Sequence, residues 1–130
     1  MLVILWFKRD LRVTDNAALL RAAELGAVVP LYIVEPGLWK QPDASARHYA
    51  FLCETLADLR ADLRTLGSDL VIRVGPAVDV LEALCRDCGA DRLISTEETG
   101  NGWTHARDRA VAVWAAGQGV RWQEMPHSAV

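Results

Sequence analysis

The chain has 130 residues, of which 52% are hydrophobic and 24% are charged, and its net charge is −3 at pH 7. This composition is globular, and the length suits one domain with its own core, which we take as residues 1–130. A domain whose main task is to grip a nucleic-acid backbone is usually basic, so the acidic balance argues against that role for the chain as a whole.

Membrane and export signals are missing from the sequence. The longest early apolar run, Leu2–Phe7, is far too short to cross a bilayer. It also lacks the flanking segments of a signal peptide. The three cysteines are an odd number in a domain that needs no disulfides, which indicates free thiols in a reducing compartment. We therefore expect a cytoplasmic protein with no membrane partner.

The first stretch of the chain predicts a strand followed by a helix. Leu2–Phe7 is uniformly apolar, as in a strand buried on both faces of a parallel sheet. Gly26 is a plausible end for the helix that follows. Its candidate N-cap residues are Thr14, Asp15 and Asn16.

A second strand and a long helix come next. Ala27–Val34 predicts the strand, and Pro30 makes us expect it to be irregular or to start near that residue. Glu35–Pro42 reads as a loop. The helix starts at Asp43 or Ser45 and ends at Gly67. Its apolar residues are spaced alternately three and four positions apart, which places them on one stripe: Tyr49, Leu52, Leu56, Leu59, Leu63 and Leu66.

The second half of the chain repeats the alternation. Leu70–Val74 and Arg92–Ser95 predict two more strands, and Val120–Gln123 predicts a fifth. Between them, Pro76 opens a helix that Gly89 closes. The apolar face of this helix comprises Val80, Leu81, Leu84 and Cys85. After a loop at Thr96–Gly102, a last helix keeps helical spacing at Ala106, Ala110, Val113 and Trp114.

Strands that alternate with helices predict an α/β domain. We expect a doubly wound (Rossmann-like), five-stranded parallel sheet with helices on both faces. In such folds, ligands bind beyond the carboxyl ends of the strands, where the strand order reverses.

Two motifs favour structural interpretations. Cys85 and Cys88 form a CxxC at the end of a predicted helix, where the dipole opposes a thiolate, so we interpret them as small core-facing residues. No phosphate-binding loop is present. Thr99–Gly102 is either a flexible turn with an N-cap or a ligand contact at a helix N-terminus. The three histidines are expected at the surface: His48, His105 and His127.

Acidic and basic residues gather at the ends of predicted strands. Glu97 and Glu98 follow the fourth strand directly, and they are either solvated surface or polar anchors for a heterocyclic ligand. The first strand runs from Trp6 into a loop crowded with three cations and two acids. An ion-paired turn explains that loop, but it does not explain why a Trp-Phe pair precedes it.

This last stretch, Trp6–Leu19, resembles the opening of photolyases and cryptochromes. Their pattern W-F-R-x-D-L-R-x-x-D-N-x-A-L is matched except at Lys8, where the family has arginine. The chain is also similar to the family at Leu31–Pro36, at the leucine pattern from Leu52 to Leu63, at Gly75–Ala77 and at Ala106–Asp108. The resemblance extends over essentially all 130 residues.

The resemblance implies a function. The family's N-terminal domain is a Rossmann-like α/β domain that holds an antenna chromophore (a folate, a deazaflavin or a flavin), which passes excitation to FAD. A helical C-terminal domain binds FAD and flips a damaged pyrimidine dimer out of DNA. We expect that domain to be absent from this chain and to be its partner, damaged DNA to be a partner only through the full-length protein, and the 130 residues alone to be non-catalytic.

The resemblance also implies where the antenna binds. An acidic residue after the fourth strand often contacts it, and Glu98 or Glu97 occupies that place. Folate-binding members tend to show Asn-x-x-Tyr-Glu there, whereas this chain has Ser95–Thr99, which favours a deazaflavin or a flavin over a folate. No metal site is expected. The candidate antenna-binding residues are Lys8, Arg9, Leu38, Trp39, Glu97, Glu98, Asn101 and Trp103.

Two rival interpretations remain at this point. A stand-alone nucleotide-binding module of the universal-stress-protein type shares the predicted architecture, but it needs a glycine-rich phosphate motif of which Gly100–Gly102 is only a fragment. A structural domain with an empty cleft is the other.

Overall fold

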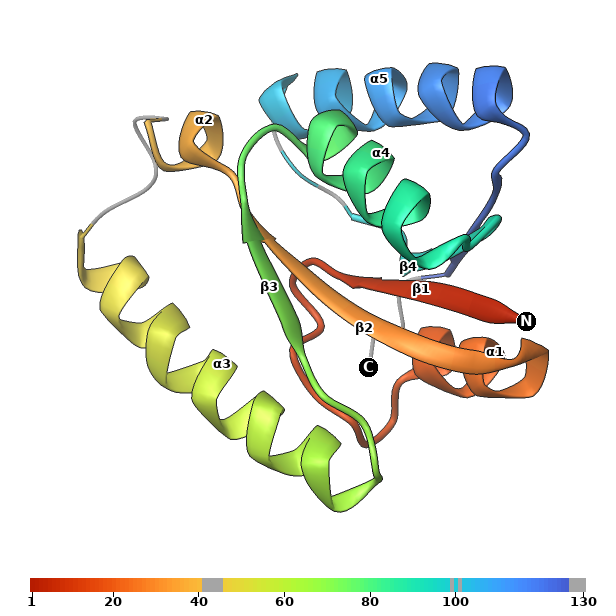
Figure 1. The fold of residues 1–130 in the computed structure, drawn as a ribbon. Coiled ribbons are helices and arrows are strands. Elements are labelled where there is room, and N and C mark those ends of the chain that lie inside the picture. The colour runs from red at the N-terminus through yellow and green to blue at the C-terminus, as the bar shows by residue number, and fades with distance from the viewer. Residues whose placement is uncertain (41–45, 99, 101, 127–130) are drawn as a thin grey trace.

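The elements of the chain follow the predicted alternation (Figure 1). The computed structural model describes residues 1–40, 46–98, 100 and 102–126, excluding the side chains of 46–49. The strands are β1 (Leu2–Phe7), β2 (Ala27–Val34), β3 (Val71–Val74), β4 (Arg92–Thr96) and β5 (Arg121–Met125). The helices are α1 (Ala17–Leu25), α2 (Pro36–Trp39), α3 (Ala46–Thr65), α4 (Ala77–Cys88) and α5 (Gly102–Gln118).

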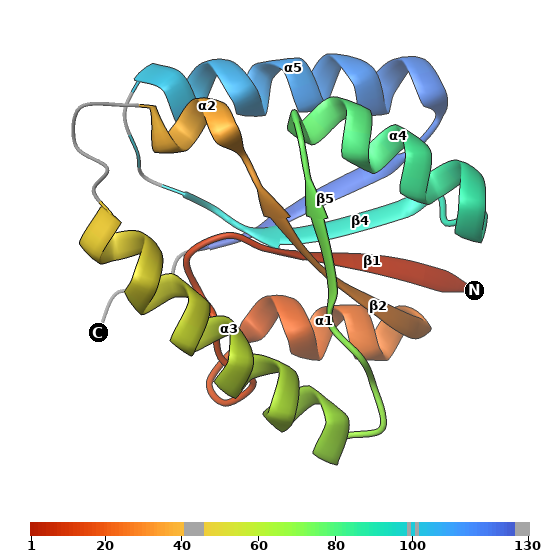
Figure 2. The ribbon, with the colours of Figure 1, turned by 60° about the vertical axis from the view of Figure 1, so that its left-hand side comes forward.

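The five strands form one all-parallel sheet in the order β3-β2-β1-β4-β5. α1 and α3 cover one face, and α4 and α5 cover the other (Figures 1 and 2). The predicted doubly wound fold is therefore confirmed. The chain leaves β1 toward β2 and β3 and later returns to β4 on the other side of β1, so the strand order reverses between β1 and β4. Ligand sites in such sheets lie at the carboxyl end of that reversal.

β1 is the centre of two cores. Its side chains alternate, so that Val3, Leu5 and Phe7 pack toward α1 and α3. Ile4 and Trp6 pack toward α4 and α5. Burial on both faces explains why this strand has no polar residue, as its sequence predicts.

The ends of α1 and α3 also follow local chemistry. The Asn16 side chain accepts a hydrogen bond from the Leu19 amide at 3.0 Å, which makes Asn16 the N-cap of α1. α3 ends at Thr65, and Gly67 adopts a φ of 82° beyond it. Of the predicted stripe, the residues from Leu52 to Leu63 are buried, but Leu66 is 63% exposed because it lies past the helix end. Tyr49 and the predicted starts of this helix, Asp43 and Ser45, lie outside the described residues or side chains.

Two predictions about β2 and its exit are wrong. β2 is continuous through Pro30, because β3 pairs only from Leu31 onward and the strand has a ladder partner on one side alone at the proline. The segment expected to be a loop from Glu35 contains α2, a single helical turn with Pro36 at its first position. Proline fixes φ near the helical value there, which favours the turn.

The predicted face of the last helix is also wrong. Ala106, Ala110 and Val113 are exposed, and Trp114 is half-buried. The buried residues of α5 are instead Thr104, Arg107, Val111 and Ala115. An arginine inside the protein reverses the pattern, because its charge is compensated by carboxylates from other elements.

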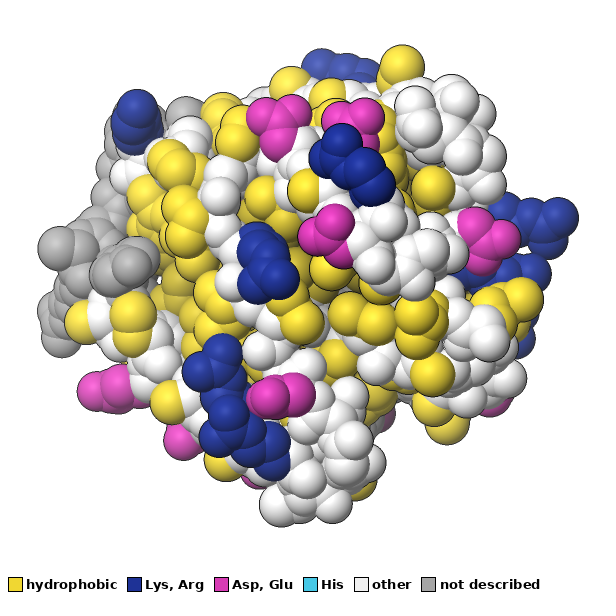
Figure 3. Space-filling view, viewed as in Figure 1, with side chains coloured by type: hydrophobic (Ala, Val, Ile, Leu, Met, Phe, Trp, Pro, Cys, Tyr) yellow, Lys and Arg dark blue, Asp and Glu magenta, His cyan; other side chains and the backbone are white. Residues whose placement is uncertain are grey.

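The remaining surface has apolar and polar regions. Hydrophobic side chains gather between α3 and α4, over the edge strand β3 (Figure 3), where Val74 is 70% exposed. No helix among the described residues combines the length and apolarity needed to span a bilayer.

Candidate functional site

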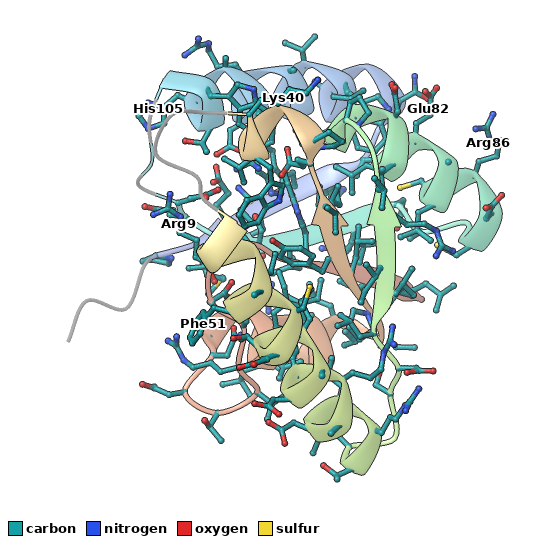
Figure 4. The ribbon with its side chains drawn as sticks, turned by 90° about the vertical axis from the view of Figure 1, so that its left-hand side faces the viewer. Arg9, Lys40, Phe51, Glu82, Arg86 and His105 are labelled. Carbon is teal, nitrogen blue, oxygen red and sulfur yellow. The ribbon has the colours of Figure 1, made fainter. Side chains whose placement is uncertain are left out.

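A pocket of about 610 Å³ lies at the carboxyl edge of the sheet, beside the β1–β4 reversal. It is bounded by the ends of β1 and β2, by α2 and by the first turns of α3. Arg9 and Phe51 lie at this side of the molecule, whereas Glu82 and Arg86 lie on α4 (Figure 4). The apolar residues that line the pocket are Trp6, Phe7, Leu11, Ile33, Leu38, Trp39, Phe51 and Leu52. Its polar lining residues are Lys8, Arg9, Arg12, Tyr32, Glu35, Thr55, Glu98 and Arg107.

The Arg107 guanidinium, from α5, organises the polar side of the pocket. Nη1 donates to Glu35 Oε1 at 2.5 Å, Nη2 donates to Glu98 Oε1, and Nε donates to Asp108 Oδ1 at 2.9 Å. The side chains of Arg107, Glu35 and Glu98 are each at most 7% exposed. Buried charges persist only when they are paired in this way, so Arg107 ties α5 to the ends of β2 and β4.

Lys8 and Arg9, at the end of β1, extend this network. Lys8 Nζ lies 3.1 Å from Asp108 Oδ1 and 4.0 Å from Glu98 Oε1. Arg9 Nε donates to Glu98 Oε2 at 3.0 Å, although the Arg9 side chain is 63% exposed. The cations Lys8, Arg9 and Arg107 are each paired with a carboxylate.

Tryptophan rings face these cations. Lys8 Nζ lies 4.3 Å from the centroid of the Trp6 ring, and the Arg107 guanidinium lies 5.0 Å from it. Trp6 also contacts Trp122, with ring centroids 6.1 Å apart. Cation–π contacts of this kind are strongest where water is excluded. They hold the two cations under the pocket and keep Trp6 in its wall.

Burial shifts the protonation of two lining groups. Desolvation raises the pKa of Glu35 to about 7, although Arg107 opposes the shift. Desolvation also raises the pKa of Tyr32 to about 12, and the charges of Glu35 and Glu98 add to this effect. Tyr32 therefore keeps its proton at neutral pH. Glu35 lies near the midpoint of its titration there.

Comparison with known proteins decides the family. Residues 3–130 match the DNA photolyase family. The chain belongs to this family. It is 38% identical over 103 residues to a chloroplastic/mitochondrial cryptochrome DASH of Arabidopsis thaliana, a match that covers 74% of this chain and 18% of the relative. It corresponds to the N-terminal α/β domain of photolyases and cryptochromes.

Solved photolyases share the fold. A class III photolyase from Agrobacterium tumefaciens superposes with a TM-score of 0.84 at 31% identity, covering 95% of this chain and 25% of that one. A photolyase from Sulfolobus tokodaii, described with two FAD molecules and the implication of a novel light-harvesting cofactor, gives 0.87 at 27% identity, with coverages of 97% and 29%. The chain thus spans about a fifth of the length of the curated relatives it matches.

Family membership settles one alternative. The universal-stress-protein interpretation is not supported, because the matches are to photolyases and cryptochromes over nearly the whole chain. The photolyase family implies a flavin and an antenna chromophore, as the sequence resemblance predicts at this general level.

The pocket is lined by five of the eight residues that the sequence predicted to bind an antenna. Those that line it are Lys8, Arg9, Leu38, Trp39 and Glu98. Glu97 is exposed and lines a neighbouring cavity of about 110 Å³ instead. Asn101 lies outside the described residues.

Trp103 is not among the residues that line the pocket. A Cβ added to Gly37 would lie 2.9 Å from the Trp103 ring, and Arg107 lies 5.7 Å from the ring centroid. Trp103 therefore positions α2, which carries Leu38 and Trp39, against α5.

Several lining residues were missed by sequence reasoning. Glu35 and Arg107 were not assigned to the site, and only their pairing across 72 residues shows that they belong to it. Tyr32 was predicted only as a residue of the second strand. Phe51 was predicted to lie on the long helix, outside its apolar stripe. The resemblance of Ala106–Asp108 to a family motif was the signal in the sequence that could have indicated a site residue on α5.

The CxxC motif is structural, as predicted. Cys85 and Cys88 pack against the core between α4 and α5, and burial raises the pKa of the Cys85 thiol to about 11. A Cβ on Gly100 would lie 2.1 Å from Thr104 Oγ1, so close packing requires glycine there. Whether this turn also contacts a ligand stays a prediction, because Thr99 and Asn101 lie outside the described residues. His105 is exposed, as predicted. The His48 side chain and His127 lie outside the described part. Among the described residues, no cluster suits a metal ion.

Proposed function

We propose that this domain binds an antenna chromophore in the pocket at the β1–β4 reversal. The observation that carries the proposal is a pocket of about 610 Å³ with an aromatic and aliphatic lining over a buried ion-paired floor. Small-molecule sites are commonly built as apolar cavities with a few placed polar groups. When bound, the chromophore would absorb light and pass its excitation to FAD.

The residues present fit a flat heterocyclic ring. Trp39 and Phe51 supply aromatic surface for a ring to stack against, and the buried rings of Trp6 and Phe7 pack beneath them. One carboxylate oxygen, Glu35 Oε2, is buried with no hydrogen-bond partner among the described residues. A ring with polar groups on one edge would contact both kinds of surface.

The charges favour a deazaflavin or a flavin over a folate. A folate carries glutamate carboxylates that need cations. The cations near the floor of the pocket are already paired with Glu35, Glu98 and Asp108. Arg12 is exposed and donates to the Asp15 carbonyl oxygen. A deazaflavin or a flavin whose side chain carries no charge therefore suits this part of the pocket better.

The activity of the whole protein is a wider proposal. We infer that the domain serves a light-dependent flavoprotein, either a photolyase that repairs pyrimidine dimers or a cryptochrome that senses blue light. Its partner would be a helical FAD-binding domain, which would contact the carboxyl edge and close the pocket. Damaged DNA would then be bound through the full-length protein, with no catalytic residue supplied by these 130 residues.

Binding measurements test the chromophore proposal. A deazaflavin, a flavin and a folate are titrated separately into the natural full-length protein, and tryptophan fluorescence reports binding. We expect the flavin or the deazaflavin to bind more tightly than the folate. Trp39→Ala and Glu98→Ala should each weaken that binding by about tenfold or more, whereas the control Arg86→Ala, on α4, should not.

Two results would count against the proposal. Tighter binding of the folate would contradict the choice of chromophore. Absence of binding by every candidate, or unchanged binding in both pocket variants, would favour the structural domain with an empty cleft.

A further inference from the structure

Glu35 offers a hydrogen-bond acceptor that the described protein does not use. The residue is 4% exposed and lines the pocket. Its Oε1 accepts from Arg107, whereas its Oε2 meets no donor among the described residues. A buried polar atom without a partner costs stability, so such an atom calls for a specific explanation.

Tyr32 offers a donor three residues earlier on the same strand end. It is 6% exposed and lines the same pocket. Within the described part of the chain, its hydroxyl makes no hydrogen bond, and it is not among the fully buried unpaired atoms, so it keeps some accessible surface. The high pKa of Tyr32, about 12, keeps the hydroxyl protonated and able to donate.

We propose that Glu35 and Tyr32 together recognise the amide edge of the bound ring. A ring N–H would donate to Glu35 Oε2, and the adjacent ring carbonyl would accept from the Tyr32 hydroxyl. This inference rests on the proposed chromophore and names the edge of its ring that the protein recognises. Flavin, deazaflavin and pterin rings all carry such an edge, so the edge orients the ring while the other pocket charges select among the ring types.

The electrostatics around Glu35 agree with this role. Arg107, Lys8 and Glu98 are the charged groups that act on it, and Arg107 holds one of its oxygens in place. A ring N–H at the second oxygen would stabilise the carboxylate form further. The apolar neighbours would exclude water, which strengthens both hydrogen bonds.

The test compares a ring with its methylated form. Lumiflavin and 3-methyllumiflavin, which differ only at the ring N–H, are titrated into the natural full-length protein. We expect methylation to weaken binding about 10- to 100-fold, the range for a hydrogen bond to a charged group. In Glu35→Gln, the methylation effect should fall to about threefold or less, whereas in the matched control Glu82→Gln, on the exposed face of α4, it should persist.

Tyr32→Phe gives an independent arm. It should weaken binding of both flavins by about 3- to 10-fold while leaving the methylation effect intact, because the hydroxyl contacts the carbonyl. If Glu35→Gln unfolds because Arg107 loses one of its carboxylate partners, Tyr32→Phe and the methylation effect in the wild type still test the inference. Equal methylation effects in the wild type and in Glu35→Gln, absence of a methylation effect in the wild type, or wild-type affinity in Tyr32→Phe would overturn the inference.

The failures are distinguishable. A parallel arm with 6-methylpterin and its N3-methyl form tests the pterin ring. If one unmethylated ring binds but methylation has no effect, only the recognition of the amide edge is wrong. If neither unmethylated ring binds the wild-type protein, both this inference and the proposed chromophore site are contradicted.

Discussion

Arg107 Nη1 lies 2.5 Å from Glu35 Oε1, and this contact joins α5 to the end of β2 beneath the pocket. The two residues come from opposite halves of the chain. Their pairing means that the pocket floor forms only when the sheet and α5 are both in place. The pocket is thus a product of the whole domain.

Replacing Arg107 should destabilise the domain strongly. Arg107→Met leaves the buried Glu35 and Glu98 carboxylates without their shared partner, at a cost of about 3–5 kcal/mol. The control Arg109→Met, on the exposed side of the same helix, should change stability by about 0.5 kcal/mol or less. Urea unfolding at pH 8 measures both. Equal midpoints for the two variants would show that the buried pair contributes nothing.

Stability should depend on pH through Glu35. Its pKa is about 7 in the folded protein against an ordinary 4.5, so the folded state binds the proton more tightly. The contribution is fully present below about pH 4.5 and is lost as the pH rises through 7. Unfolding free energies at pH 5 and pH 8 should therefore differ less in Glu35→Gln than in the wild type. An identical pH difference in both proteins would contradict the shift.

The stripe of α3 should behave as core. Leu56 is 7% exposed and packs with the β1 side chains Val3, Leu5 and Phe7 in one cluster. Leu56→Ala should cost about 2–5 kcal/mol, because the removed side chain leaves a cavity. Leu66→Ala, at a 63% exposed position just past the helix, is the control and should cost much less. A denaturant midpoint unchanged by Leu56→Ala would mean that α3 is not packed on the sheet.

The thiols should differ in reactivity. Burial raises the pKa of Cys85 to about 11, so almost none of it is thiolate at pH 8. Cys53 is exposed on α3. Iodoacetamide at pH 8 should therefore modify Cys53 well before Cys85, as peptide mass spectrometry would show. Faster labelling of Cys85 would indicate an activated CxxC.

The sequence predicted the elements that periodic apolar patterns and local capping chemistry determine. The apolar run Leu2–Phe7 and the leucines from Leu52 to Leu63 marked β1 and α3, because burial on one side or both sides leaves a periodic pattern. The edge of the sheet that carries the site followed from the general rule that ligands bind at the carboxyl ends of parallel strands.

The sequence could not predict which charges are buried. Arg107 and Glu35 lie 72 residues apart, and a charged side chain reads as exposed until its partner is known. The same limitation reversed the face of α5, where Arg107 is inside and Val113 is 74% exposed. Pairing between distant residues is a tertiary property that leaves no local period.

The most direct test of the central claim is to fill the pocket. Thr55, on α3, lines it, and Thr55→Trp would place an indole in the space assigned to the chromophore. Glu54→Trp, at the exposed neighbouring position, is the control. Binding of the deazaflavin or the flavin to the natural full-length protein is measured for both, alongside circular dichroism to verify the fold. We predict that Thr55→Trp abolishes binding and that Glu54→Trp preserves it; wild-type affinity in a folded Thr55→Trp protein would contradict the site.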